Sequence, residues 1–236
     1  MYHYVRPIIG SEYERIKGLE VKKFIEQIDY LSKEYQIIDV HELIAAINQN
    51  SLIPENSVVL SFDDGYKDHF KYVFPELKKR EITATFFPVS SIVSQNTILD
   101  VNKIHFILAV QPNIDDLFNK VLKFLDLYRD EFSLESSISY LTKYFKVNRF
   151  DSKEVNFIKR VLQLALPIEL RSMIVDDLFS FYVTNDQQSF SKELYASEQN
   201  LREMESYGMT IGSHGSSHFW LDSLSIEDQE KDIKKS

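Results

Sequence analysis

Two pairs of side chains in this sequence have the types and spacing of a metal-dependent active site. Asp63 and Asp64 follow the apolar run 58–60, which predicts a buried strand. Adjacent carboxylates at the end of such a strand repel each other and lose water, so this position favours a cation or a proton donor. His214 and His218 are four residues apart and can share one face of a helical turn. One aspartate and two histidines form a three-ligand site that leaves a metal position open for water.

Each pair also has an ordinary structural explanation. Asp-Gly is a turn signal, and either Asp63 or Asp64 could cap the following helix. Two histidines at helical spacing are common on solvated surfaces. Both pairs, however, follow predicted strands, 58–60 before the aspartates and 209–212 before His214, and their joint occurrence favours one shared site.

The residues around these pairs resemble two motifs of the polysaccharide deacetylase family (NodB homology, carbohydrate esterase family 4). The stretch 61–66, Ser-Phe-Asp-Asp-Gly-Tyr, is similar to the first motif, and 213–221, Ser-His-Gly-Ser-Ser-His-Phe-Trp-Leu, is similar to the second. The flanking stretches 73–78 and 82–87 also resemble the helix and strand that follow the first motif. The resemblance implies that Asp63 is the catalytic base and that the metal ligands are Asp64, His214 and His218.

The layout from residue 1 to Asp64 resembles the poly-N-acetylglucosamine deacetylase branch, in which the histidine that protonates the leaving amine lies near the N-terminus. The dipeptide Tyr2-His3 is similar to that segment, so the resemblance implies His3 as the general acid. The family's third motif, which carries an arginine, and its fourth, an apolar wall around an aspartate, are not found after residue 221. Three explanations stay open: a fragment, completion by another chain, or a degenerate member.

Composition narrows the class of protein. The 236 residues are 44% hydrophobic, enough for a sizeable core, and contain no cysteine, which excludes disulfides and thiolate metal sites. The net charge of −9 argues against nucleic acid or an anionic membrane as the main partner. No apolar run is long enough for a membrane span, and the N-terminus lacks the pattern of a signal peptide. We therefore expect a cytoplasmic protein.

Hydrophobic periodicity predicts an α/β fold interrupted by helices. Apolar residues at helical spacing predict a helix over about 20–34, and the run 82–89 predicts a second buried strand after that of 58–60. Strand, helix and strand in this order are typical of parallel βαβ units. The resemblance implies that these units belong to a partial or distorted (β/α) barrel of the NodB type.

The stretch 97–196 is helical by periodicity and far longer than an ordinary connection. We therefore expect a NodB-like domain formed by 1–96 and 197–236, apparently incomplete at its C-terminus, with 97–196 as a helical insertion. A substrate-selecting lid, a structural subdomain and a dimer surface all remain open as roles for it.

Three further histidines are interpreted as structural. His41 and His69 are expected on solvated helix surfaces, and His105, between apolar neighbours, is expected to be packed.

These observations predict a metal-dependent hydrolase that removes an N-acyl group, expected to be acetyl, from an amino sugar or polysaccharide. Nitrogen and oxygen ligands suit Zn²⁺, with Co²⁺, Ni²⁺ and Fe²⁺ as other options. Two alternatives remain: a two-His-one-carboxylate iron enzyme, and a non-catalytic saccharide-binding or assembly protein that retains the fold. The iron enzymes usually carry the carboxylate two residues after the first histidine, whereas Asp64 lies 150 positions before His214.

Overall fold

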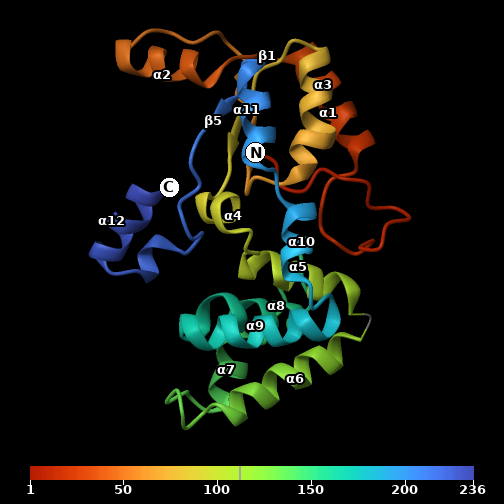
Figure 1. Cartoon of the computed structure of the whole chain (residues 1–236), viewed down its shortest axis with the longest axis vertical. Helices are drawn as coiled ribbons and strands as arrows, with labels where there is room; N and C mark the ends of the chain where they lie inside the picture. The colour runs from red at the N-terminus through yellow and green to blue at the C-terminus, as the bar shows by residue number, and fades with distance from the viewer. Residues whose placement is uncertain (112) are drawn as a thin grey trace. The chain divides into compact units, whose positions relative to one another are not determined.

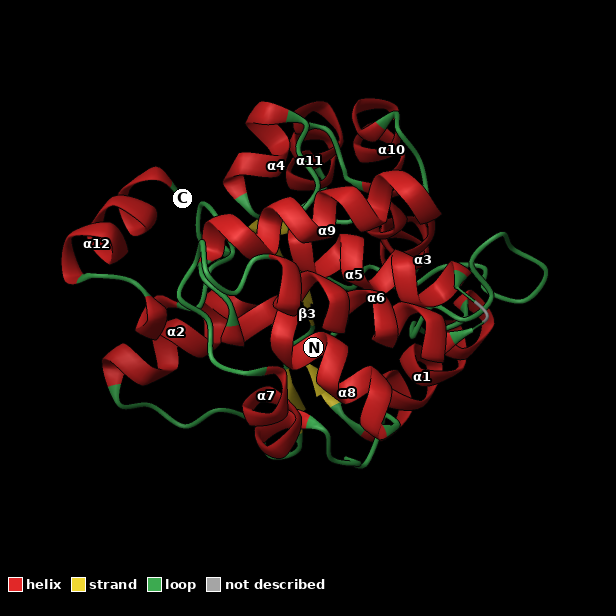
Figure 2. Ribbon diagram, turned by 90° about the horizontal axis from the view of Figure 1, so that it is seen from below, coloured by secondary structure: helices red, strands yellow, loops and turns green. Residues whose placement is uncertain are grey.

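The computed structural model describes residues 1–111 and 113–236, and most of this chain is helical (Figure 2). It divides into two compact units, which are described separately. The first consists of Met1–Ser11, Lys17–Thr97 and Gln188–Ser236, and the second of Glu12–Ile16 and Ile98–Gln187. The strands found in the described residues all belong to the first unit, whereas the second is helical (Figure 1).

The strands of the first unit form two small parallel sheets. One pairs β1 (Gln36–Ile37) with β2 (Ser57–Val58). The other has the order β3-β4-β5, with β3 (Ser61–Asp63), β4 (Thr85–Phe87) and β5 (Thr210–Ile211) in parallel. The run that we predicted as a single strand ending at Asp63 is therefore divided between the sheets. Its first half pairs with β1, and its second half pairs with β4.

Helices of the first unit pack their apolar faces on the three-stranded sheet. Phe24 and Ile28 of α1, Leu77 of α3 and Met204 of α11 join the strand residues Phe62 and Phe86 in one buried cluster. The helices of this unit, which include the predicted helix 20–34 as α1, are α1 (Val21–Glu34), α2 (Val40–Gln49), η1 (His69–Val73, a π-helical turn), α3 (Phe74–Lys79), α4 (Ser90–Gln95), α10 (Gln187–Leu194, which starts at the unit boundary), α11 (Glu198–Ser206), η3 (Leu221–Ser223, a 3₁₀ turn) and α12 (Ile226–Lys235).

The second unit is a helical body with its own core. Leu117, Val121 and Leu125 line the buried face of α6, at the spacing expected for an amphipathic helix. The long helix α9 buries Leu170 and Ile174. The helices of this unit are α5 (Asp100–Val110), α6 (Ile114–Leu127), α7 (Ser137–Tyr144), α8 (Lys153–Arg160), η2 (Val161–Ala165, a π-helical turn) and α9 (Ile168–Tyr182).

The predicted α/β class is confirmed, whereas the barrel is not seen in the described residues. A closed barrel of this kind needs eight strands tied into one sheet. Here the described residues supply five short strands in two separate sheets. None of the helices in the described part of the chain has the length and hydropathy needed to span a membrane.

Candidate metal centre and active site

The predicted ligands follow strands of the three-stranded sheet at its carboxyl edge. β3 ends at Asp63, so Asp64 is the first residue beyond it, and β5 ends three residues before His214. Because β3, β4 and β5 are parallel, these strand ends meet at one edge, where ligand sites of α/β folds commonly form. The sequence thus places an acidic residue and a histidine at one edge through two segments far apart in the chain.

A sharp turn directly after β3 depends on glycine. Asp64 and Gly65 both have left-handed backbone angles, with φ of 67° and 65°. A Cβ atom on Gly65 would lie 2.7 Å from Cβ of Pro88 and 3.0 Å from its Cα. A side chain at residue 65 would therefore push β3 and the segment after β4 apart, and glycine is required here.

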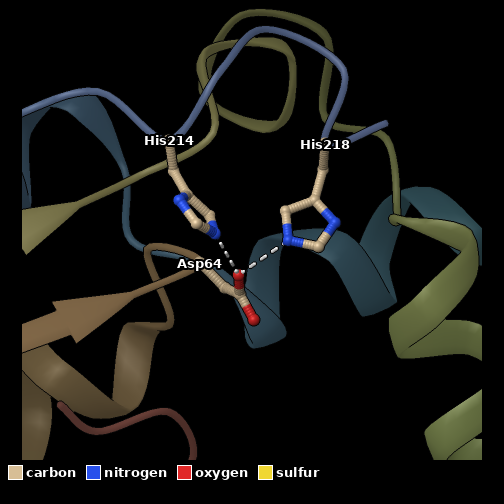
Figure 3. Close-up of side chains that lie close together, drawn as sticks. All are labelled: Asp64, His214 and His218. Carbon is tan, nitrogen blue, oxygen red and sulfur yellow. Dashed lines mark ion pairs between the residues drawn. The ribbon is translucent and has the colours of Figure 1, made fainter. Parts of the chain in front are cut away.

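Asp64, His214 and His218 converge on one point (Figure 3). The Nε2 atom of His218 lies 3.2 Å from Oδ1 of Asp64, and that of His214 lies 3.5 Å from the same oxygen. The potential ligand atoms of the three residues all lie within 4.8 Å of one another. The structure therefore brings together the three residues that the sequence predicted as ligands.

These three residues fit a divalent metal ion. A tetrahedral Zn²⁺ with bonds of about 2.0–2.2 Å separates its ligand atoms by about 3.4 Å, close to the nitrogen–oxygen distances found here. Oδ1 of Asp64 is buried and has no hydrogen-bond partner among the described residues. A buried carboxylate oxygen without a partner is costly, and a bound cation would remove that cost.

Tyr66 orients the carboxylate of Asp64. Its hydroxyl donates a 2.6 Å hydrogen bond to Oδ2 of Asp64, which leaves Oδ1 turned to the two imidazoles. Burial alone would raise the pKa of Asp64, but the His218 imidazole and the Tyr66 hydroxyl outweigh it and hold the pKa at about 2. The carboxylate is therefore ionised at neutral pH, as a metal ligand must be. Sequence reasoning assigned no role to Tyr66, although its place in the first motif was a usable signal.

Asp63 and His3 lie together beside the ligands. Backbone bonds hold the N-terminal segment along β3: Tyr2 N–H donates to Ser61 O at 2.8 Å, and Asp63 N–H donates to Tyr2 O at 3.0 Å. This pairing sets Nε2 of His3 3.9 Å from Oδ2 of Asp63. The Asp63 side chain is 10% exposed and that of His3 46% exposed. The predicted base and acid are thus neighbours, and their catalytic roles stay predictions.

His69 is buried, so our expectation of a solvated side chain was wrong. It is 1% exposed, and Nε2 donates a 2.7 Å hydrogen bond to the carbonyl oxygen of His3. Because a carbonyl can only accept, Nε2 carries the proton. The π-helical turn η1, which begins at His69, changes the phase of the helix that Pro75 then restarts as α3. The expectation rested on the charged neighbour Asp68, which is itself buried, at 4% exposed.

The two histidines predicted as ligands lie in an irregular loop, so the expected helical turn was also wrong. Residues 212–220 form no helix. Gly215 and His218 have left-handed φ values of 76° and 57°, which a right-handed helix does not contain. The imidazoles meet because this loop folds back on itself (Figure 3), with ring centroids 5.0 Å apart.

Comparisons with known proteins agree with the motifs. Residues 52–123 match the model of the polysaccharide deacetylase family. A segment of 79 residues is 32% identical to poly-beta-1,6-N-acetyl-D-glucosamine N-deacetylase of Escherichia coli strain K12, and equally so to that of Escherichia coli O157:H7. The matched segment covers 33% of this chain and 12% of each relative.

The fold is similar to that of a solved deacetylase. The structure of Streptococcus pyogenes deacetylase PplD in complex with acetate matches 100% of this chain and 63% of its own, with a TM-score of 0.54 and 14% sequence identity. At that identity the likeness concerns the fold alone. This chain spans less than two thirds of the length of each of these proteins. The motif that carries Asp63 and Asp64 lies inside the matched stretch 52–123, so this part of the chain is similar to the polysaccharide deacetylase family.

Proposed function

We propose that this chain is a metal-dependent hydrolase that removes an N-acyl group, in the first instance acetyl, from an amino sugar. One observation carries the proposal: Asp64, His214 and His218 converge as ligands directly beside a second carboxylate, Asp63, and a further imidazole, His3. A three-residue ligand set beside an acid–base pair is what hydrolysis of an unactivated amide requires.

The metal ion is proposed to be Zn²⁺, held by Asp64, His214 and His218. When bound, it would polarise the amide carbonyl and make water more acidic. The orienting bond from Tyr66 would keep Asp64 Oδ1 available to the ion. The donor set of two nitrogens and one oxygen suits Zn²⁺ and does not exclude the related divalent transition metals.

Asp63 and His3 are proposed to move the protons. Asp63 would take a proton from the attacking water as its oxygen bonds to the acyl carbon. His3 would donate a proton to the amide nitrogen, because an amine leaves poorly unless it is protonated as the C–N bond breaks. The products are the free carboxylic acid and the amino sugar, and the proton taken by Asp63 returns to solvent.

The substrate class is proposed to be an N-acetylated saccharide. The family supports a carbohydrate substrate, and the two Escherichia coli relatives are by name deacetylases of poly-beta-1,6-N-acetyl-D-glucosamine. We also propose that 97–196 is an insertion into a deacetylase domain made of 1–96 and 197–236. The compact helical body of Ile98–Gln187 supports this division.

The experiment is acetate release from N-acetylglucosamine oligomers of β-1,4 and β-1,6 linkage, with Zn²⁺-loaded protein. We expect one acetate for each new free amine, loss of turnover with a chelator, and its return with Zn²⁺. Asp63→Asn is the matched control, because it should keep the metal and lose turnover. Saccharide binding without any acetate release would favour the non-catalytic alternative and overturn the proposal.

A further inference from the structure

The loop that joins the two histidine ligands is held on one side by α4. The backbone N–H of Ser90 donates to the carbonyl oxygen of Gly215 at 3.2 Å, and the N–H of Ser91 donates to that of Ser216 at 3.1 Å. These bonds fix two carbonyl groups of the loop. They leave its N–H groups to find partners elsewhere.

A single carboxylate, that of Asp232 in α12, binds the other side of the loop. Its Oδ2 accepts the N–H of Ser216 at 3.0 Å, and its Oδ1 accepts the N–H of Ser217 at 2.9 Å. Asp232 is 7% exposed and is the one buried residue of α12, whose apolar Ile226 and Ile233 are exposed. The helix therefore meets the rest of the unit through this carboxylate and through a hydrogen bond from Ser90 Oγ to the Lys235 carbonyl, rather than through an apolar face.

Gly215 permits this close approach. A Cβ atom on Gly215 would lie 2.9 Å from Oδ2 of Asp232, and φ at this residue is 76°. Both the contact and the backbone angle disfavour a side chain here. The loop between the ligands is thus shaped to bring two consecutive N–H groups onto one buried oxygen pair.

We propose that Asp232 is a positioning residue of the metal centre. Its carboxylate fixes the backbone of Ser216 and Ser217, midway between His214 and His218, and so holds both imidazoles toward Asp64. Bonds from N–H groups to a charged acceptor are stronger than neutral ones, and their loss would leave two N–H groups with no partner in a mostly buried place. This inference rests on the proposed function, since it assumes that the three residues bind a metal.

The consequence is a change in metal affinity. Without Asp232 the loop would occupy several arrangements, and only a fraction of them would present both imidazoles together. The apparent affinity for Zn²⁺ would then be the intrinsic affinity multiplied by that fraction. Partners that orient metal ligands typically contribute about 10–100-fold to affinity.

The test is the Zn²⁺ dissociation constant of the full chain, measured by competition with a chromophoric chelator. Asp232→Asn keeps the volume but offers one acceptor oxygen and turns an NH₂ group toward the other N–H, so the constant should rise about 10–100-fold. Glu230→Gln is the matched control, because Glu230 is an exposed acid on the same helix and pairs with Lys234. The Zn²⁺ dissociation constant of this variant should equal that of the wild type. Amide hydrogen exchange of metal-free protein gives a second readout, in which Ser216 and Ser217 should lose protection in Asp232→Asn alone.

The outcomes separate this inference from the proposed function. If the wild-type chain bound no Zn²⁺, the proposed function would fail, and this inference with it. If the wild type bound Zn²⁺ and Asp232→Asn bound it within twofold, or kept both amides protected, only the inference would be overturned. Should Asp232→Asn not fold, Gly215→Ala displaces the same contact from the loop side, and an unchanged Zn²⁺ constant in that variant would equally overturn it.

Discussion

Replacement of the buried His69 by phenylalanine should change how the stability of the protein depends on pH. The imidazole is 1% exposed, donates to the His3 carbonyl at 2.7 Å, and packs against Phe62 and Phe86 with ring centroids 5.3 and 5.8 Å away. Phenylalanine fills the space of the ring but has neither the N–H donor nor a titratable group. His69→Phe therefore isolates what the buried imidazole contributes.

The magnitude follows from the pKa of His69. Burial lowers this pKa from 6.5 to about 4, against the hydrogen bond to the His3 carbonyl, which favours the protonated form. Below pH 6.5 the unfolded chain binds a proton that the folded chain refuses until about pH 4. The free energy of unfolding of the wild type therefore has its full value above pH 6.5 as far as His69 is concerned, and it decreases as the pH falls toward 4. The loss amounts to about 3 kcal/mol over that interval. Separately, His69→Phe removes the donor to the His3 carbonyl. This should lower the free energy of unfolding of the variant by about 1–3 kcal/mol at every pH.

The assay is urea unfolding of metal-free wild type and His69→Phe between pH 7.5 and 4.5. The wild type should be more stable at pH 7.5, and its advantage should shrink by about 2–3 kcal/mol toward pH 4.5. His41→Gln, which removes an exposed imidazole, is measured beside it as the control. A difference between wild type and His69→Phe that is the same at every pH would refute the reasoning, because it would mean that His69 titrates alike in both states.

Three further predictions concern residues near His69. Burial raises the pKa of Asp68 from 3.8 to about 6, although the nearby Arg6 opposes this shift. The folded chain therefore binds a proton before the unfolded chain does, and the free energy of unfolding of the wild type should rise by about 3 kcal/mol relative to Asp68→Asn as the pH falls from 6 to 3.8. A fall of that difference in the same urea series would contradict this. Tyr66→Phe removes the bond to Asp64 and should weaken Zn²⁺ binding about 10–100-fold in the chelator competition, whereas an unchanged constant would show that the bond does not orient the ligand. His3→Ala should lower kcat on the amide by about 10²–10⁴ but hurt an activated ester far less, with Zn²⁺ content unchanged; equal losses on both substrates would show that His3 is structural.

Local patterns predicted the elements that carry the site but not all of their geometry. The helix of α1 and the acidic pair at the end of β3 follow from periodicity and from residue type, which depend on neighbours in the chain. The pairing of strands into two sheets depends on contacts between distant segments, so the number of strands in each sheet could not be derived.

In the candidate site, too, the residue types were predictable from the sequence, whereas the backbone geometry was not. His214 and His218 were predicted as ligands from their types and spacing, but their loop conformation was not predicted, because it depends on left-handed angles at Gly215 and His218. The burial of His69 was missed because its charged neighbour Asp68 suggested a solvated position, whereas both side chains are buried. The contact of Asp232 with Ser216 spans 16 residues, and no spacing rule connects an acid in a helix to amides in a preceding loop.

The most direct test of the central claim is the Zn²⁺ content of three forms of the chain after dialysis against a small excess of the ion. The account assigns Asp64 to the metal and its neighbour Asp63 to proton transfer. It predicts one Zn²⁺ for each chain in the wild type and in Asp63→Asn, and an empty site in Asp64→Asn. Equal loss from Asp63→Asn and Asp64→Asn, or full retention in Asp64→Asn, would contradict it.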